Sequence, residues 1–487
     1  MLEFDITGDA ADRASIGRSQ QGRHHGAAAR GGTSGAGWTR RRWLSAGSLA
    51  TLGLSWSSLL ARRAAAGPSP ESPRATAKAC LQLFLWGGPS AQETWDPKPT
   101  APEATRSQFD AIATRTPGMA IVEHLPLLAQ RSDRYTIVRS LTHTGVNHGT
   151  SAYHMLTGHL HWSPGTLRHP TKKDMPNLAA SAAPLLEHAP HLPGCVSLPS
   201  VVNDGDGLPV PGQGAGMLGD AYAPFLVEGD PTADDFRVDA LGLAEGVSRQ
   251  RLARRVSLRQ TIDERLEHLS RSSDGQALSE WNQQAWNLLA SRETEAAFDL
   301  ASEPATLRER YGRHHFGQSL VLARRLIEAG VPLVTVYWNS PRNTDDESWD
   351  THVDQPRRMK EHLLPALDRA LSALLDDLAE RNLLETTLVT WFGEFGRTPL
   401  INRHAGRDHW GFCQSIGLAG GGVPGGACYG ASTRDGGYAE REPVTPDDLA
   451  ATLLTALGID PRIERHDRSG RPVPLSYGTA VGELLSA

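Results

Sequence analysis

The sequence predicts an α/β fold in which a parallel β-sheet lies between layers of helices, built as a single large domain. Three apolar runs carry this prediction: Leu81–Trp86, Val331–Trp338 and Leu388–Phe392, each of which ends in a charged turn. Continuous apolar runs of this length are typical of strands that are covered on both faces. The amphipathic segment 356–381 joins the last two runs, and a strand–helix–strand order implies a parallel pair with a right-handed connection.

The composition fits a folded protein with a large core. The chain has 487 residues, of which 39% are hydrophobic, and a net charge of -6. This mildly acidic balance gives no indication of nucleic-acid binding. Its four cysteines are scattered without C-x-x-C spacing, so they indicate neither a structural zinc site nor a dense disulfide frame. The sequence does not indicate an oligomeric state.

The N-terminus is predicted to be an export signal. Residues 1–38 are rich in Gly, Ser, Ala and Arg and are expected to be disordered. Residues 39–67 resemble a twin-arginine signal, with the string TRRRWL, a short apolar run at Ala46–Leu60 and small residues at 64–66. We therefore expect an exported protein of the periplasm or cell surface, with no stable membrane span after cleavage. The alternative is a chance arginine cluster ahead of a short buried helix.

The folded domain is predicted to span residues 77–487. Residues 160–235 are rich in Pro and Gly and predict a loop-rich insertion, and residues 236–329 carry the charge and leucine spacing of a helical insertion. After the first apolar run, the chain turns at Gly87 and reaches Glu93 and Asp96. These carboxylates are candidate metal ligands at a strand end; the alternative is a solvated loop with a turn-capping aspartate.

A histidine-rich segment follows a second expected strand at Tyr135–Val138. Four histidines fall within residues 143–159, and the pattern predicts a helix from Ser151 to the C-cap Gly158, with Thr150 or Ser151 as N-cap. A helix N-terminus favours a bound anion. His148, just before this helix, is a candidate nucleophile, acid/base or metal ligand.

The turns after the other two apolar runs carry further candidate ligands. Asp350 and His352 follow the second run, and residues two apart on an extended segment point to the same face, where they could share a metal ion. The third run leads to the candidate ligands Glu394, Asp408 and His409, to the candidate catalytic residue Arg397 and to the candidate anion-binding residue Arg407. Because open α/β sheets present chemistry at the carboxyl edge of their strands, we expect the three strand ends and the histidine-rich loop to form one site.

Seven motifs in order resemble the domain of unknown function 1501 family, exported bacterial proteins abundant in planctomycetes. They are Gly87-Gly88-Pro89-Ser90 with Trp95–Pro99, Asn147-His148-Gly149, Leu156-Thr157-Gly158, Ala323–Val331, Trp349-Asp350-Thr351-His352, Gly393–Pro399 and Gly406–Trp410. That family resembles a branch of the alkaline phosphatase and sulfatase superfamily. The resemblance implies an alkaline-phosphatase-like sheet and a metal centre whose ligands are Glu93 or Asp96 together with Asp350, His352, Glu394 and His409.

The chain departs from that superfamily at three places. It lacks the Cys/Ser-x-Pro-x-Arg signature of sulfatases, Glu394-Phe395 stands where the superfamily has Asp-His, and the first strand lacks a paired Asp-Asp. Thr150 or Ser151 is then a candidate substitute nucleophile. The expected cofactor is a divalent ion, with Zn²⁺, Ca²⁺, Mg²⁺ and Mn²⁺ all open.

Three functions are compatible with these patterns. The first is a metal-dependent hydrolase of phosphate or sulfate esters, acting on a small-molecule or glycan ester whose oxygens Arg397 or Arg407 would hold. The second is a non-catalytic exported binding or scaffold protein that keeps the fold and a structural ion. The third is a metal-independent hydrolase that uses His148.

Overall fold

The computed structural model describes residues 73–485 except 164–168, 206, 243–247, 249–250, 253, 256, 259–282, 284, 339–346 and 468. The predicted N-terminal extension and signal segment lie outside these residues, as do parts of both predicted insertions. None of the helices within the described ranges has the length and apolar character needed to cross a membrane.

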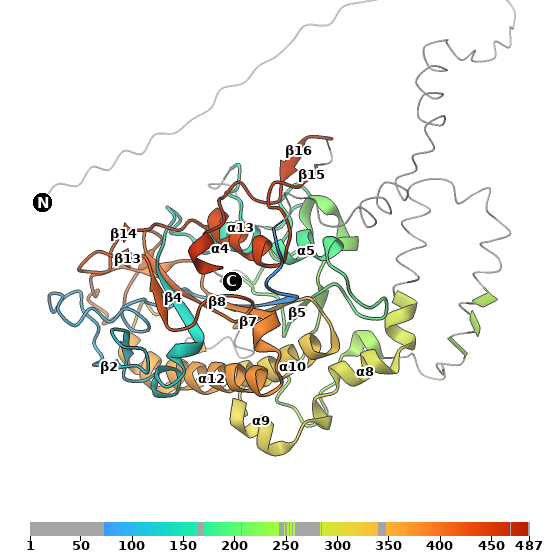
Figure 1. Ribbon diagram of the computed structural model, residues 1–487, viewed down its shortest axis with the longest axis horizontal. Helices are drawn as coiled ribbons and strands as arrows, with labels where there is room; N and C mark the ends of the chain where they lie inside the picture. The colour runs from blue at the N-terminus through green and yellow to red at the C-terminus, as the bar shows by residue number, and fades with distance from the viewer. Residues whose placement is uncertain are drawn as a thin grey trace, which may run out of the picture. The chain divides into compact units, whose positions relative to one another are not determined.

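A central sheet of eight strands organises the fold, in the order β12-β4-β11-β8-β1-β7-β5-β6 (Figure 1). Its strands are β1 (Ala79–Leu85), β4 (Tyr135–Leu141), β5 (Cys195–Leu198), β6 (Phe225–Leu226), β7 (Leu333–Trp338), β8 (Thr387–Phe392), β11 (Gln414–Ala419) and β12 (Ala427–Tyr429). All the pairings are parallel except those of β11, which runs antiparallel to β4 and β8. The predicted α/β fold with a mainly parallel sheet is confirmed.

Strand β1 lies at the centre of this sheet. Leu81 pairs with Val334 of β7 on one side and with Val389 of β8 on the other. All seven residues of β1 are buried. Strands β7 and β8 are therefore parallel, as their connection implied, but the expectation that they form an adjacent pair was wrong. The fully buried β1, apolar except for Gln82, has two covered faces and takes the place between them.

Helices cover both faces of the sheet. On one face lie α10 (His315–Ala329) and α12 (Leu364–Glu380), which share a core with Leu81 and Leu83. On the other lie α4 (His148–Thr157), α5 (Leu178–Ala182) and α13 (Pro446–Ala456), which share a core with Cys80 and Phe84. Alternate residues of β1 thus enter opposite cores, because successive side chains of a strand point to opposite faces.

The remaining elements are short. The segment predicted as one helix at 356–381 consists of α11 (Gln355–Arg358), a π-helical turn (Met359–Leu363) and α12. Further short α-helices in the described part of the chain include α3 (Pro126–Ala129), α8 (Arg292–Phe298) and α9 (Ala305–Tyr311). Four two-stranded sheets pair β2 (Ala111–Ala113) with β3 (Ala120–Val122), β9 (Gly396–Arg397) with β10 (His409–Trp410), β13 (Ala431–Ser432) with β14 (Ala439–Arg441), and β15 (Glu464–His466) with β16 (Pro472–Pro474).

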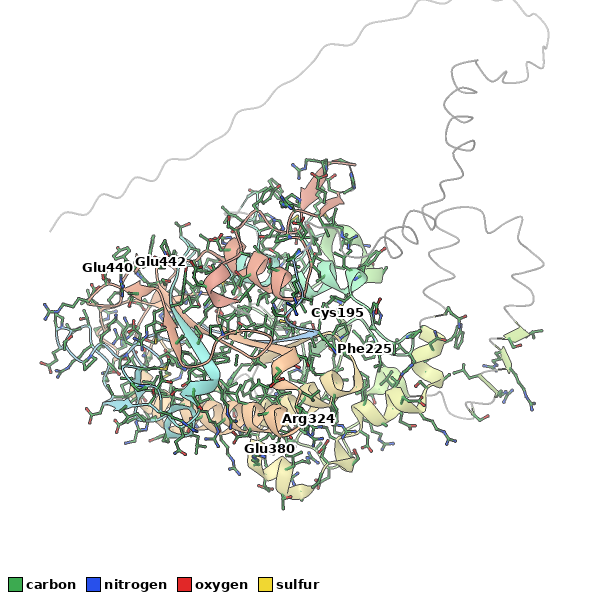
Figure 2. All side chains as sticks on the ribbon, viewed as in Figure 1. Cys195, Phe225, Arg324, Glu380, Glu440 and Glu442 are labelled. Atoms are coloured by element: carbon green, nitrogen blue, oxygen red, sulfur yellow. The ribbon has the colours of Figure 1, made fainter. Side chains whose placement is uncertain are left out.

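An ion-pair network centred on Arg324, which is labelled in Figure 2, joins the helices of one layer. The guanidinium of Arg324 on α10 is fully buried and lies 2.7 Å from Glu303, 2.6 Å from Glu328 and 2.9 Å from Asp377 on α12. Buried charges persist only when they are paired, so this network fixes α10 against α12.

Helix α4 begins earlier than the sequence pattern suggested. The side chain of Asn147 accepts a hydrogen bond from the backbone N–H of Thr150 (3.3 Å), so Asn147 is the N-cap and His148 is the first helical residue. The expectation that Thr150 or Ser151 caps this helix was wrong, because an asparagine three residues upstream satisfies the first free N–H groups. The C-cap at Gly158, in the left-handed region at φ 68°, is as expected.

Candidate metal centre

Four parallel strands end at one edge of the sheet and bring the predicted residues together. Strand β1 leads to Gly87, β4 to His148, β7 to Asp350 and β8 to Glu394. The hairpin of β9 and β10 pairs His409 with Arg397 and carries His409 to the same edge. This is the carboxyl edge, where open α/β sheets hold their ligands.

His148, Asp350 and His409 form a group that could hold a metal ion. One ligand atom of each lies within 4.8 Å of the other two, and no other group of this kind occurs in the part of the chain that the structure describes. The carboxylate of Asp350 lies at the centre, 3.3 Å from His148 Nε2 and 3.1 Å from His409 Nε2. His352 adjoins the group, with its Nε2 3.1 Å from the same carboxylate and 2.9 Å from His409 Nε2.

Each of these three histidines is oriented by an acceptor at its other ring nitrogen. The Nδ1–H of His148 donates to Glu394 (2.6 Å), that of His352 to Asp408 (2.7 Å), and that of His409 to the carbonyl oxygen of Val146 (2.9 Å). All three Nε2 atoms therefore face Asp350. Metal-binding histidines are commonly oriented by such a second partner, and the arrangement fits a metal ion.

The electrostatics of the cluster favour positive charge beside Asp350. Burial lowers the pKa of His148, but hydrogen bonds to Asp350 and Glu394 outweigh it and raise this pKa to about 9. The Asp350 carboxylate raises the pKa of His352, whereas burial lowers the pKa of His409. Burial acts to raise the pKa of Asp350, but the three histidines and Arg397 hold it far below its usual range. In the ion-free chain, protons on the histidines supply this positive charge, and a divalent cation could replace those protons.

Arg397 fixes the position of Asp350. Its guanidinium is fully buried and donates to the Asp350 carboxylate (2.5 Å), with further bonds to the carbonyl oxygens of Gly88 (3.0 Å) and Arg407 (3.1 Å). It also contacts the carbonyl oxygens of Gly87 and Trp349. All three of its nitrogens thus have protein acceptors, and its predicted catalytic role remains a prediction.

The structure places Glu93, Asp96 and Arg407 outside the three-ligand group. Glu93 and Arg407 form a buried pair with two contacts of 2.9 Å, and Glu93 also accepts from Ser90 (2.5 Å) and Gln355 (2.7 Å). Asp96 pairs with Lys98 at 3.0 Å. The metal-binding roles of the two carboxylates and the anion-binding role of Arg407 remain predictions.

The two candidate nucleophiles lie in the first turn of α4. The hydroxyl of Thr150 donates to the carbonyl oxygen of Asn147 at 3.3 Å. Ser151 is 1% exposed, and a Cβ added at Gly145 would lie 2.4 Å from its hydroxyl oxygen. The Ser151 hydroxyl therefore lies beneath the loop that precedes α4, and the catalytic roles of both residues remain predictions.

Three further residues shape the site, and the sequence analysis had assigned them no role. The rings of Trp86 and Phe395 pack against His148 with centroids 4.9 and 5.0 Å away, and Phe395 also packs against His409 at 4.5 Å. His143 donates from Nε2 to the carbonyl oxygen of Glu394 (2.8 Å). Two features of the sequence could have identified these residues as part of the site. Phe395 stands where the superfamily has a histidine, and His143 belongs to the histidine-rich loop.

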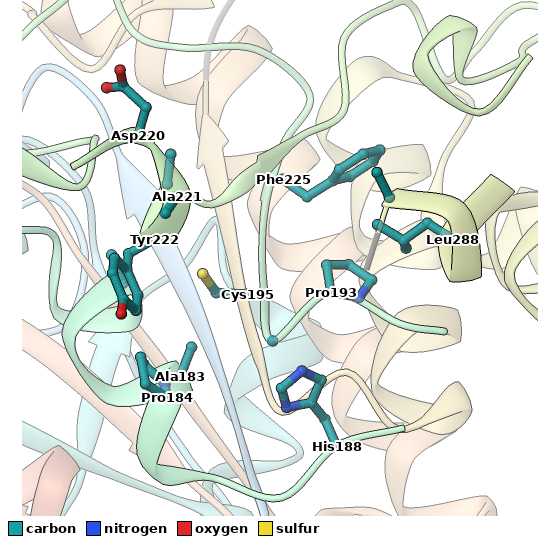
Figure 3. A pocket seen from close by; sticks show the side chains of 14 residues that line it. Ala183, Pro184, His188, Pro193, Cys195, Asp220, Ala221, Tyr222, Phe225 and Leu288 are labelled. Carbon is teal, nitrogen blue, oxygen red and sulfur yellow. The ribbon is translucent and has the colours of Figure 1, made fainter. Parts of the chain in front are cut away.

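A separate cavity lies at the opposite edge of the sheet, at the start of β5 (Figure 3). Its volume is about 420 Å³, and its lining includes Cys195, Tyr222 and Phe225. The thiol of Cys195 is buried, which raises its pKa to about 12. Asp220 is the one acidic residue among the described residues that line this cavity, and its carboxylate points away from Cys195 in Figure 3.

The fold and the site together define an α/β protein with histidines and carboxylates clustered at the carboxyl edge of a mainly parallel sheet. The chain belongs to the family described as "Protein of unknown function (DUF1501)", whose model matches residues 77–485. No curated protein matches the sequence.

Several solved structures are similar in fold. The phosphonate monoester hydrolase SpPMH from Silicibacter pomeroyi is 12% identical, with a TM-score of 0.38 over 85% of this chain and 77% of its own. The PsFucS1 sulfatase from Pseudoalteromonas sp. is 13% identical, with a TM-score of 0.36 over 85% and 72%. Ps i-CgsB is 12% identical, with a TM-score of 0.39 over 84% and 75%.

Proposed function

We propose that the protein is an exported metal-dependent hydrolase of phosphate or sulfate esters, with a divalent ion held by His148, Asp350 and His409. The observation that carries this proposal is the convergence of three imidazole Nε2 atoms on one carboxylate, each ring oriented through its other nitrogen. A site that only balanced the charge of one aspartate would not need three histidines in this orientation.

The donor set narrows the choice of ion. Imidazole nitrogens with one carboxylate suit Zn²⁺ or Mn²⁺, whereas Ca²⁺ and Mg²⁺ prefer oxygen ligands alone. His352 is placed to act as a further ligand, because its Nε2 lies 3.1 Å from the Asp350 carboxylate. A bound ion would polarise the ester oxygen of a small-molecule or glycan substrate.

The surrounding residues would hold this centre in place. Arg397 holds Asp350 at the edge of the sheet, and the rings of Trp86 and Phe395 fix the plane of His148. Burial of Arg397 and Phe395 keeps water from one side of the site, which strengthens the electrostatics there.

The test compares metal content and ester hydrolysis of the wild-type chain with those of Asp350→Asn. The wild-type chain is expected to carry a stoichiometric ion and to hydrolyse p-nitrophenyl phosphate or sulfate. Asp350→Asn is expected to lose more than the roughly 10–100-fold in metal affinity that removal of a second-shell partner costs. Glu361→Gln, on an exposed side chain, is the control. Absence of an ion from the wild-type chain would refute the proposal.

The second candidate is a non-catalytic exported binding or scaffold protein that retains the ion. The observation that favours it is the engagement of a predicted anion-binding residue and a candidate nucleophile with protein partners: Arg407 pairs with Glu93, and the Thr150 hydroxyl donates within its own helix cap. A tightly bound ion in a chain that hydrolyses neither ester would support this alternative.

A further inference from the structure

We propose that Glu394 is a positioning residue for His148, in place of the ligand role that the sequence pattern suggested for it. The inference rests on the proposed metal centre, which it deepens by separating the residues that would touch the ion from one that would act through another residue.

The carboxylate of Glu394 already accepts hydrogen bonds from other groups of the protein. It is 0% exposed, and the backbone N–H of Gly87 lies 3.0 and 3.1 Å from its two oxygens. The Nδ1–H of His148 donates to one of these oxygens at 2.6 Å. Glu394 also lies outside the group of ligand atoms formed by His148, Asp350 and His409. Its oxygens therefore face the back of the His148 ring, away from the Nε2 that would bind the ion.

The backbone around Glu394 holds this carboxylate in place. The carbonyl oxygen of Glu394 accepts from His143 Nε2 (2.8 Å), and His143 Nδ1 in turn accepts from the N–H of Gly145 (3.0 Å). A Cβ added at Gly393 would lie 2.9 Å from the Cα of Gly88, so the two turns pack backbone against backbone. A swing of the Glu394 carboxylate towards an ion would therefore break its bonds to the Gly87 N–H and to His148.

The neighbouring pair of His352 and Asp408 provides an internal comparison. Both pairs join a carboxylate to Nδ1 over similar distances, 2.6 Å for His148 and 2.7 Å for His352. The carboxylate of Asp408, however, is 56% exposed, whereas that of Glu394 is fully buried. Water can replace the exposed partner but not the buried one. We therefore expect Glu394 to control the affinity for the ion much more strongly than Asp408 does.

The experiment measures Zn²⁺ affinity of the full chain by competition with a chelator, and the visible spectrum of the Co²⁺-loaded chain. Glu394→Gln is expected to weaken Zn²⁺ binding by roughly 10–100-fold, the range for second-shell partners, while the Co²⁺ bands keep their positions. Glu394→Asp keeps the charge but withdraws the oxygens from His148, and it should weaken binding in the same direction. Asp408→Asn is the matched control, with a smaller loss.

Three outcomes would overturn the assignment. Unchanged Zn²⁺ affinity in both Glu394 variants would remove the positioning role. A Co²⁺ spectrum altered in Glu394→Gln as it is in Asp350→Asn would make Glu394 a ligand. Absence of Zn²⁺ and Co²⁺ binding by the wild-type chain would instead overturn the metal centre itself, and with it both proposals.

Discussion

Replacing Gly87 with alanine perturbs the site at the point where three of its parts meet. The N–H of Gly87 binds the Glu394 carboxylate, and its carbonyl oxygen accepts from Arg397. The residue lies at φ +109°, and an added Cβ would sit 2.3 Å from the backbone nitrogen of Asp350 and 2.7 Å from the carbonyl carbon of Trp349. Both atoms belong to the backbone, so no side-chain rotation can relieve the overlap.

Two costs follow from this geometry. A non-glycine residue held at a rarely populated backbone angle costs about 1–3 kcal/mol. The overlap must in addition displace the segment that carries Asp350, and a shift of about 1 Å in a catalytic group can reduce activity by roughly 100-fold. We expect Gly87→Ala to lower both the free energy of unfolding and the affinity for Zn²⁺.

The control is Gly118→Ala, which separates backbone strain from steric overlap. Gly118 also has a positive φ, +83°, but nothing lies within 4 Å of an added Cβ. Urea denaturation and Zn²⁺ titration of both variants should show a loss of stability in each, but a loss of Zn²⁺ affinity only for Gly87→Ala. Equal losses of stability together with wild-type Zn²⁺ affinity in Gly87→Ala would refute the argument.

Two further predictions concern stability. Arg324→Met leaves three carboxylates near one another and should lower the free energy of unfolding, measured by urea denaturation, by about 3–5 kcal/mol. The control Arg313→Met breaks a partly exposed pair and should lower it by about 1 kcal/mol or less. Similar losses of stability in the two variants would refute the role of the buried network. Burial lowers the pKa of His143 from 6.5 to about 4, so the unfolded chain binds more protons in this window and stability should fall by about 3 kcal/mol as pH drops through it. His143→Gln should lose this part of the pH dependence, and an unchanged slope would contradict it.

The sequence predicted the centre of the fold well because the strongest signals were local. The apolar runs Leu81–Trp86, Val331–Trp338 and Leu388–Phe392 correspond to β1, β7 and β8 within two residues at each end. A strand buried on both faces has no polar alternation to obscure it. The convergence of charged turns at one edge then followed from the parallel order of the strands.

The hydrogen-bond partners within the site could not be predicted, because each depends on a contact between residues far apart in the chain. The pairing of Glu93 with Arg407 is one case: an isolated strand-end carboxylate gives no sign of a buried arginine that follows another strand. The orientation of His409 depends likewise on the carbonyl oxygen of Val146. Sequence patterns identify which side chains can act as acids or ligands, but not which partner each one meets.

The central position of β1 has a consequence for the order of events during protein synthesis. This strand leaves the ribosome early, but its two neighbours, β7 and β8, end only at Trp338 and Phe392. Until translation has passed residue 392, the apolar β1 has no native partner on at least one side and resembles an exposed edge strand that is prone to aggregation. Completion of β8 is thus the step at which β1 gains its second native neighbour, and the site at its carboxyl edge can assemble only after the later His409 has also been made.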